Sequence, residues 1–336
     1  MRKVKIVQIG MNTNSHSTHI FGSLKKQQDI FEIVGYVLPE NEKTRLPEQV
    51  KHLEGFRELT LEEALTDPQI EAVTVETDEI YLSKYALLAA KHGKHIHMEK
   101  PGGISLAEFE TLIDTVKQSG KVFHTGYMYR YNPYVKDLMQ RVKAGELGDI
   151  ISVEAQMSCP HTVQVRQWLE QFPGGMMFFL GCHLVDLILQ LQGKPERIIP
   201  LNKSTGKDGV TSTDYGMAVF EYPNGVSFAK TYAAELGGFV RRQLVVTGTK
   251  GTVELKPFEI LRDGGQYTDR TVYTSQDWHQ PGEKSTSAFY DRYDEMMASF
   301  AAMVRGEKEN PYTYDYELEL YKMVLQCCGG EADVSE

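Results

Sequence analysis

The first 125 residues alternate between short apolar runs and segments with the apolar spacing of helices. Residues 4–9 (VKIVQI) and 31–37 (FEIVGYV) have the pattern of buried strands, and helices are expected at 82–94 and 105–120. Strands that alternate with helices predict a doubly wound parallel sheet of five or six strands over residues 1–125. The residues EKP at 99–101 are expected to follow the fifth strand, at the carboxyl edge where open parallel sheets bind ligands.

The pattern changes after residue 125. A helix and a strand are followed by a buried helix from Gly181, and beyond Pro195 apolar positions recur mainly with a period of two. The period-two runs are joined by PNG and GTKG turns, which indicates an antiparallel sheet. Two helical segments, 290–306 and 314–328, close the chain. Residues 126–336 are therefore predicted to form a second, α+β domain.

Composition narrows the classes of function. The 336 residues suit two domains, and the net charge of -10 without a run of Lys or Arg disfavours nucleic-acid binding. No apolar stretch approaches the roughly 18 residues of a membrane helix, and the amino terminus resembles neither a signal peptide nor an anchor. The four cysteines lack CxxC spacing, which favours a reducing cytoplasm. We expect a cytoplasmic protein without nucleic-acid or membrane partners.

The first strand, its loop and the following helix have the order of a dinucleotide-binding unit. In such a unit the loop approaches a pyrophosphate, and the helix amino terminus offers free N–H groups. Gly10 takes the first glycine position of the fingerprint, whereas Asn12 and Ser15 take the second and third. Asn tolerates left-handed backbone and Ser is small, so we predict that Gly10, Asn12 and Ser15 line a cofactor loop.

The end of the second strand departs from the usual pattern. An acid normally follows this strand and binds the adenosine ribose, but here Leu38 and Pro39 follow it and Glu40 is the nearest acid. Three interpretations stay open: a displaced ribose contact, a preference for the phosphorylated cofactor through Lys43 or Arg45, and weak cofactor binding.

The chain resembles the Gfo/Idh/MocA oxidoreductases. The resemblance rests on EKP, on RYNP after the next strand, on GELGDI before a strand and on GGMMFFLGCHLVD at the start of a helix, and it extends to GTKGTVEL and MVRGEKENP. It implies an NAD- or NADP-binding domain and a second domain whose open sheet supports a homodimer or homotetramer. It further implies that the nicotinamide and a sugar or polyol meet beside the EKP lysine.

Carried over by position, the resemblance assigns cofactor contacts to five further residues. They are a strand-end threonine, the three EKP residues and a tryptophan: Thr77, Glu99, Lys100, Pro101 and Trp168. The arginine that usually accompanies this tryptophan is replaced by Leu169. His183 matches the active-site histidine of the family.

These residues suit the oxidation of a secondary alcohol. Histidine side chains ordinarily titrate near neutrality, so His183 would suit removal of the hydroxyl proton, while Lys100 as a cation would hold the oxygen. Tyr127 and Arg130, in GYMYRYNPY, are further candidates for contact with the substrate, although closely spaced aromatics are also typical of packing.

Several departures from the family touch proton transfer. Phe179 stands where dehydrogenases of the family carry an Asp, four residues before His183. His161 could replace that proton-transfer partner, and Asp186 could orient His183 from the same helix face. A metal site at His183 and Asp186 is not expected, because no third ligand lies nearby in the sequence.

The departures leave three hypotheses for function. The first is an NAD(P)-dependent oxidoreductase for a sugar, sugar acid or cyclic polyol. The second is an enzyme that retains its cofactor and uses transient oxidation to assist hydrolysis, elimination or epimerisation. The third is a non-catalytic ligand-binding regulator on the same fold.

Overall fold

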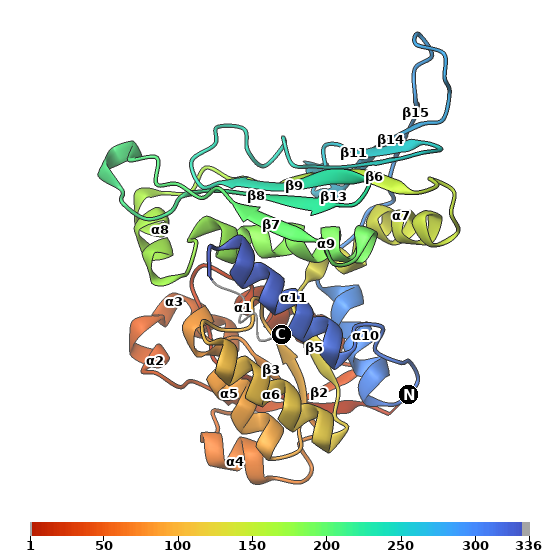
Figure 1. The fold of residues 1–336 in the computed structure, drawn as a ribbon. Helices are drawn as coiled ribbons and strands as arrows, with labels where there is room; N and C mark the ends of the chain where they lie inside the picture. The colour runs from red at the N-terminus through yellow and green to blue at the C-terminus, as the bar shows by residue number, and fades with distance from the viewer. Residues whose placement is uncertain (1, 331–336) are drawn as a thin grey trace. The chain divides into compact units, whose positions relative to one another are not determined.

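The computed structural model describes residues 2–330, which divide into two compact units (Figure 1). The first unit contains residues 2–128 and 292–321, and the second contains 129–291 and 322–330. The expected division at 125/126 is contiguous, whereas these units are not. Helix α10 (Asp294–Val304) joins the first unit because Phe300 contacts the rings of His97 and His124, and Asp294 accepts a hydrogen bond from Ser23.

A parallel sheet forms the centre of the first unit. Its strands lie in the order β2-β1-β3-β4-β5, with the bounds β1 Val4–Ile9, β2 Phe31–Val37, β3 Ala72–Val75, β4 His95–Met98 and β5 Phe123–Thr125. The chain places β2 on one side of β1 and β3 on the other, so the strand order reverses between β1 and β3. Ligands of doubly wound sheets bind at such a reversal, outside the carboxyl ends of the strands.

The expected position of EKP in the sheet is corrected by one strand. EKP follows β4, the fourth strand in chain order, rather than a fifth. The segment between β2 and β3 forms short helices and an isolated bridge. These helices are α2 (Glu42–Arg45), α3 (Pro47–Val50), η1 (Lys51–Leu53) and α4 (Leu61–Thr66).

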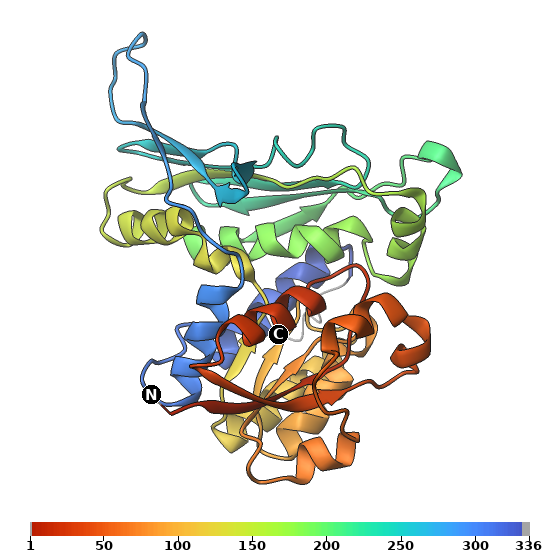
Figure 2. The same cartoon turned by 180° about the vertical axis from the view of Figure 1, so that it is seen from behind.

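Helices cover both faces of the parallel sheet. Helix α1 (Ser17–Lys26) lies with α10 on one face (Figure 2), and α5 (Leu82–Lys91) and α6 (Leu106–Ser119) lie on the other. The expected start and end of α6 are confirmed: the Ser105 hydroxyl accepts the N–H of Glu108, and Gly120 ends the helix in left-handed backbone. The last helix, α11 (Tyr314–Cys327), fixes the segment after EKP, because Tyr321 donates a hydrogen bond to the carbonyl of Gly103.

The second unit contains an eight-stranded sheet of mainly antiparallel strands. The order is β15-β14-β11-β10-β6-β9-β8-β7, and only β6 and β9 pair in parallel. The bounds are β6 Ile150–Gln156, β7 Arg197–Pro200, β8 Tyr215–Tyr222, β9 Gly225–Tyr232, β10 Gln243–Gly248, β11 Thr252–Leu255, β14 Asp269–Tyr273 and β15 Glu283–Thr286. A separate hairpin pairs β12 (Ile260–Arg262) with β13 (Gly265–Tyr267). The predicted α+β domain with an antiparallel sheet is confirmed.

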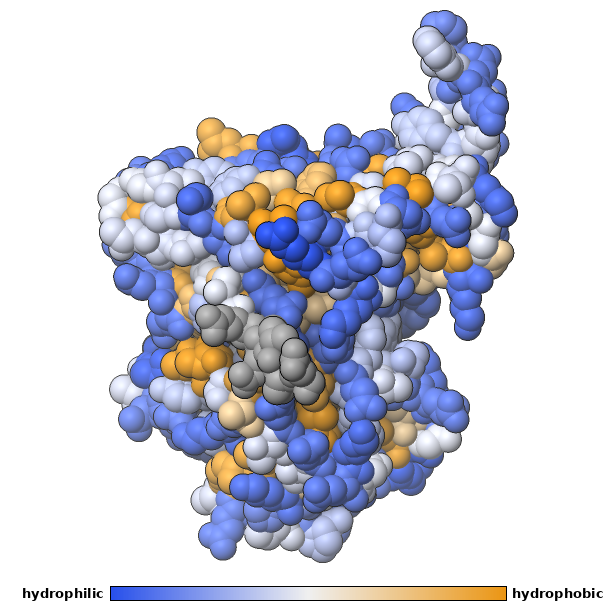
Figure 3. Space-filling model, viewed as in Figure 1, coloured by the Kyte–Doolittle hydropathy of each residue, from blue (hydrophilic) through white to orange (hydrophobic). Residues whose placement is uncertain are grey.

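Helices lie along one face of this sheet, as Figure 1 shows. They are α7 (Pro133–Lys143), α8 (Val163–Trp168) and the buried α9 (Cys182–Gln192). The loop between β14 and β15 projects from the sheet and has a mainly hydrophilic to neutral surface (Figure 3), although its Trp278 is 95% exposed. Every helix within residues 2–330 is too short or too polar to cross a membrane.

Candidate functional site

Gly10 allows two loops of the first unit to approach each other. It ends β1 with φ +88°, and a Cβ atom there would lie 2.4 Å from Cγ2 of Thr77. Glycine is therefore required both by the backbone conformation and by the space. The structure thus brings together Gly10 and Thr77, two residues that the sequence assigned to the cofactor.

Side-chain hydrogen bonds organise the rest of this loop. The amide nitrogen of Asn12 donates to the carbonyl of Glu76 over 3.1 Å, and its oxygen accepts the N–H of Ser15 over 2.9 Å. The Ser15 hydroxyl donates to Oε1 of Glu99 over 2.8 Å. Asn12 and Ser15 therefore tie the loop to the segments that follow β3 and β4, in place of the two glycines of the usual fingerprint.

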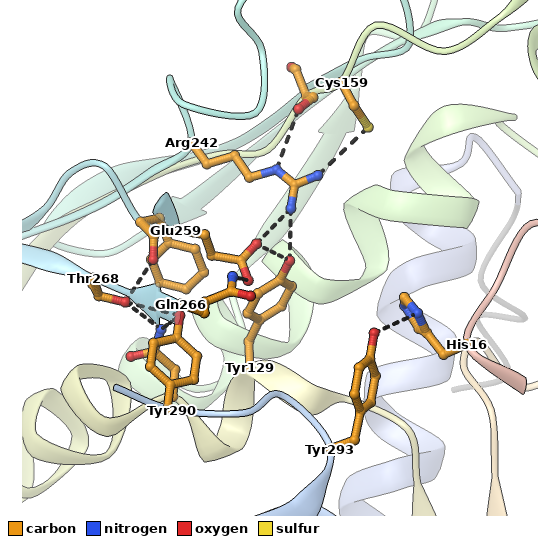
Figure 4. Close-up of polar contacts among 12 residues, drawn as sticks. His16, Tyr129, Cys159, Arg242, Glu259, Gln266, Thr268, Tyr290 and Tyr293 are labelled. Carbon is orange, nitrogen blue, oxygen red and sulfur yellow. Dashed lines mark hydrogen bonds and ion pairs between the residues drawn. The ribbon is translucent and has the colours of Figure 1, made fainter. Parts of the chain in front are cut away.

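The amino terminus of α1 suits an anion. The side chain of its N-cap residue, His16, makes no capping hydrogen bond, and the first turn carries no acidic residue. His16 Nδ1 instead lies 3.0 Å from the Tyr293 hydroxyl (Figure 4). Backbone N–H groups and the helix dipole favour negative charge at such a terminus. The loop and helix together fit the pyrophosphate of a dinucleotide.

Lys100 lies among buried acids. Its side chain is 2% exposed, and its Nζ atom lies 3.6 Å from Oε1 of Glu99. Glu76 and Glu79, after β3, are at most 1% exposed. Burial raises the pKa of Glu79 to about 8 despite the opposing effect of Lys100, and burial next to Glu99 raises the pKa of Glu76 well above its ordinary value. The sequence analysis missed these two acids, because their burial depends on neighbours from other segments of the chain.

The basic residues near the end of β2 are already engaged. The Glu40 carboxylate accepts hydrogen bonds from Lys84 Nζ at 2.5 Å and the Tyr85 hydroxyl at 2.7 Å, which lower its pKa. Lys43 pairs with Glu58 at 2.5 Å, and Arg45 pairs with Asp78 at 3.0 Å; these are exposed ion pairs. A carboxylate thus occupies the region where an acid would select the ribose hydroxyls.

His183 belongs to a buried network in the second unit (Figure 4 shows part of it). It follows a π-helical turn, Met177–Gly181, and is 1% exposed. Its ring meets the Tyr129 ring edge-on at 4.8 Å. The Tyr129 hydroxyl donates to Oε2 of Glu259 over 2.7 Å and accepts from Nη1 of Arg242 over 2.9 Å. π-Helical turns like the one before His183 occur frequently at functional sites.

The same network reaches His161. Arg242 and Glu259 form a buried ion pair at 2.7 Å, and Nη2 of Arg242 lies 3.6 Å from the Cys159 sulfur. That sulfur lies 3.1 Å from Nε2 of His161. Burial, and next the charge of Arg242, lower the pKa of His161 to about 4, so the ring is neutral at pH 7. The sequence analysis did not identify Arg242 and Glu259, which lie just before β10 and β12 and whose pairing leaves no local motif.

Two family models match the chain. Residues 4–127 match the oxidoreductase family with an NAD-binding Rossmann fold, and residues 135–254 match the GFO/IDH/MocA C-terminal domain. The chain belongs to the Gfo/Idh/MocA oxidoreductase family. Its first unit is accordingly an NAD-binding Rossmann domain, as the sequence predicted.

The chain is also similar in sequence or fold to individual oxidoreductases. Trans-1,2-dihydrobenzene-1,2-diol dehydrogenase of Bos taurus is 29% identical over 202 residues, which cover 58% of this chain and 57% of that protein. An NADP-dependent scyllo-inositol 2-dehydrogenase of Bacillus subtilis is 25% identical over 66% of this chain and 61% of its own. The matches therefore span less than two thirds of these relatives. An oxidoreductase structure from Thermotoga maritima has a TM-score of 0.78 at 17% identity and covers 97% of this chain and 96% of its own, which shows the shared fold.

An aromatic cluster surrounds Phe179, the residue that the sequence analysis expects where dehydrogenases of the family carry an acid. Phe179 is 5% exposed, and its ring meets Trp168 at 5.0 Å and His161 at 6.2 Å. Trp168 also packs against Phe172 at 4.7 Å. The position therefore offers an apolar surface instead of a carboxylate, and the cofactor contact assigned to Trp168 stays a prediction.

The remaining candidates are buried in packed surroundings. Arg130 donates to both oxygens of Asp186, the closest at 2.8 Å, and Gln190 donates to the same carboxylate. This buried pair accounts for Arg130 and Asp186 without a ligand, and their substrate roles stay predictions. Tyr127, in the first unit, is 3% exposed. Within residues 2–330, no group of three or more His, Cys, Asp or Glu side chains is arranged to hold a metal ion.

Proposed function

We propose that the protein is an NAD(P)-dependent dehydrogenase that oxidises a secondary alcohol of a sugar, sugar acid or cyclic polyol. The observation that carries the proposal is Lys100. It is a 2% exposed cation after β4, in an NAD-binding Rossmann domain, on the side of the sheet where that fold binds its ligands. A buried cation at this position suits an alcohol oxygen that becomes more negative during oxidation.

Each predicted residue has a distinct task in this proposal. The loop of Gly10, Asn12 and Ser15 and the amino terminus of α1 would hold the pyrophosphate of the cofactor. The bound nicotinamide supplies a hydride acceptor. Lys100 holds the alcohol oxygen, and His183 accepts the hydroxyl proton.

The substrate class is supported by the names of the relatives. The bovine relative is named for a cyclic diol and the Bacillus relative for an inositol, so each name specifies a hydroxyl-bearing ring. We therefore propose cyclic polyols and sugars as the first compounds to test, and a homodimer or homotetramer as the active assembly.

The first experiment is a thermal-shift titration with NAD, NADH, NADP and NADPH. A ligand at about 100 times its Kd stabilises a folded protein by about 2.7 kcal/mol, so even a modest binder is detected. Lys100→Met should then abolish turnover of the best polyol while cofactor binding persists. Lys91→Met, on the exposed end of α5, is the matched control and should behave as wild type. Normal turnover by the Lys100 variant would contradict the proposal.

A second candidate is favoured by Phe179. Loss of an acid beside the active-site histidine of the family suits an enzyme that retains its cofactor and uses transient oxidation to assist hydrolysis, elimination or epimerisation. Such an enzyme forms product without net accumulation of NADH, which absorbance at the NADH band measures directly. A non-catalytic regulator would bind ligand and show neither product nor NADH.

A further inference from the structure

Three carboxyl groups are buried together after β3 and β4. Glu76, Glu79 and Glu99 are each at most 1% exposed, and the charges of all three act on one another. Both carboxyl oxygens of Glu76, both of Glu79 and Oε2 of Glu99 have no hydrogen-bond partner within residues 2–330. Buried polar atoms are normally hydrogen-bonded, so orphaned oxygens at a ligand-binding edge need an explanation.

The groups around Glu76, Glu79 and Glu99 carry too little positive charge to balance three ionised carboxylates. Lys100 is the cation that acts on all three carboxyls. His97 Nε2 lies 3.7 Å from Oε1 of Glu76, but burial lowers the pKa of His97 to about 3, so this ring is neutral and its nitrogen is itself an orphan.

The other nearby groups leave this balance unchanged. Asp78, next to Glu79, forms an ion pair with Arg45. The Ser15 hydroxyl donates its hydrogen bond to Glu99. Burial raises the pKa of all three glutamates, that of Glu79 to about 8. Part of the cluster therefore binds protons near neutral pH, and its charge is sensitive to any new charge placed beside it.

The strand order would place this cluster on the nicotinamide side of a bound cofactor. Dinucleotides bind doubly wound sheets at the strand reversal, here between β1 and β3, and the adenosine ribose is held at the end of β2. The nicotinamide half would then reach the ends of β3 and β4, which are followed by Glu76, Glu79 and Glu99. The family match is an independent reason to expect a dinucleotide there.

We propose that Glu76 and Glu79, together with Glu99, sense the charge of the nicotinamide ring and couple the redox state of the cofactor to proton release. The oxidised ring is positive and the reduced ring is neutral, whereas the phosphates of the two forms are the same. A positive ring stabilises ionised carboxylates, so binding of NAD releases protons from the cluster, and binding of NADH does not. This inference rests on the proposed function, because it places the nicotinamide beside Lys100.

The coupling has a measurable size. For each proton released, the affinity for the oxidised form rises up to tenfold per pH unit relative to the reduced form. For Glu79, whose pKa burial raises to about 8, the rise is expected around that pH. The protein then favours the oxidised cofactor increasingly as the pH rises.

Calorimetric titration measures the released protons directly. The full-length protein is titrated with NAD and separately with NADH, at pH 7.5, in two buffers of different ionisation enthalpy; the difference in heat gives the number of protons. The corresponding phosphorylated pair is used if it is the pair that binds. Glu79→Gln is the main variant, and Glu76→Gln replaces it if the first does not fold. Glu62→Gln, an exposed carboxyl in α4 of the same unit, is the control.

We expect the wild-type protein to release protons on binding NAD and few or none on binding NADH. The Glu79 or Glu76 variant should lose most of this difference, whereas the Glu62 variant should keep it. Equal proton release with both cofactors would overturn it, and so would an unchanged difference in both cluster variants. Absence of binding by every cofactor would instead remove the proposed function itself, so the two failures are distinguishable.

Discussion

Replacing Glu42 with Gln should remove a large part of the alkaline instability of the Rossmann unit. Glu42 lies at the start of α2 and is 0% exposed, and its Oε2 atom accepts the N–H of Met11 over 3.0 Å. Burial raises the pKa of this carboxyl from 4.5 to about 8, despite that hydrogen bond. A glutamine keeps an oxygen that accepts from Met11 but carries no titrating proton.

The sign and size of the effect follow from the two pKa values. Between pH 4.5 and about 8 the folded state binds more protons at Glu42 than the unfolded state does, so the free energy of unfolding falls as the pH rises through this window. Each pKa unit corresponds to about 1.4 kcal/mol, which makes the full loss on the order of 5 kcal/mol above pH 8. For a domain of this size that corresponds to a decrease in Tm of roughly 10 °C or more.

Thermal unfolding at pH 5, 7 and 9 tests this reasoning. We expect Glu42→Gln to match wild type closely at pH 5 and to exceed its Tm by an increasing margin at pH 7 and 9. Glu48→Gln is the control, because Glu48 lies in the neighbouring α3 with a 74% exposed side chain. A Glu42 variant whose Tm runs parallel to that of wild type from pH 5 to pH 9 would refute the assignment of a buried, proton-binding carboxyl.

Three further predictions concern other parts of the chain. Arg242→Met should destabilise the protein by about 3–5 kcal/mol in urea unfolding, because it removes the cation of a buried ion pair, and the double variant with Glu259→Gln should recover much of the loss; no recovery would argue against the pair. The ionised Glu40 should make NAD bind about tenfold more tightly than NADP, and Glu40→Gln should narrow that ratio; a tighter NADP complex in wild type would contradict this. Iodide should quench Trp278 more strongly than the half-buried Trp168, so Trp278→Phe should lower the iodide quenching constant of the protein, and an unchanged constant would contradict the exposure of Trp278.

The sequence predicted the fold well where local pattern determines it. Buried apolar runs, the Ser105 cap and Gly120 are local signals, and each corresponds to an observed strand or helix end. The errors arose where distant segments decide. The expected position of EKP after a fifth strand was wrong, because three strands, β1 to β3, precede β4. Helix α10 joins the first unit through Phe300 and Asp294, and no local pattern encodes a contact with residues more than 170 positions earlier.

The candidate site also contains some residues that local sequence predicts and others that only the folded chain reveals. Gly10 is recognisable because its positive φ and its close approach to Thr77 allow no residue other than glycine. Lys100 is recognisable because it follows a strand within the EKP motif. The pairing of Arg242 with Glu259 was invisible, since the two residues lie outside the strands, one before β10 and one before β12, and only the folded chain brings their charges together. Glu76 was missed for a similar reason: its burial depends on neighbours from other strands.

The buried acids of the NAD-binding domain bear on the direction of the reaction. Glu76 and Glu79 place two buried carboxyl groups after β3. On the inference above, these acids favour the positive, oxidised nicotinamide. Both the dehydrogenase and the redox-assisted candidate begin by removing hydride from substrate, which requires the oxidised cofactor in the resting protein. A reductase would need the reduced form bound first, and the buried acids oppose this increasingly above neutral pH. The charge of the domain therefore supports a protein that starts its cycle by oxidation.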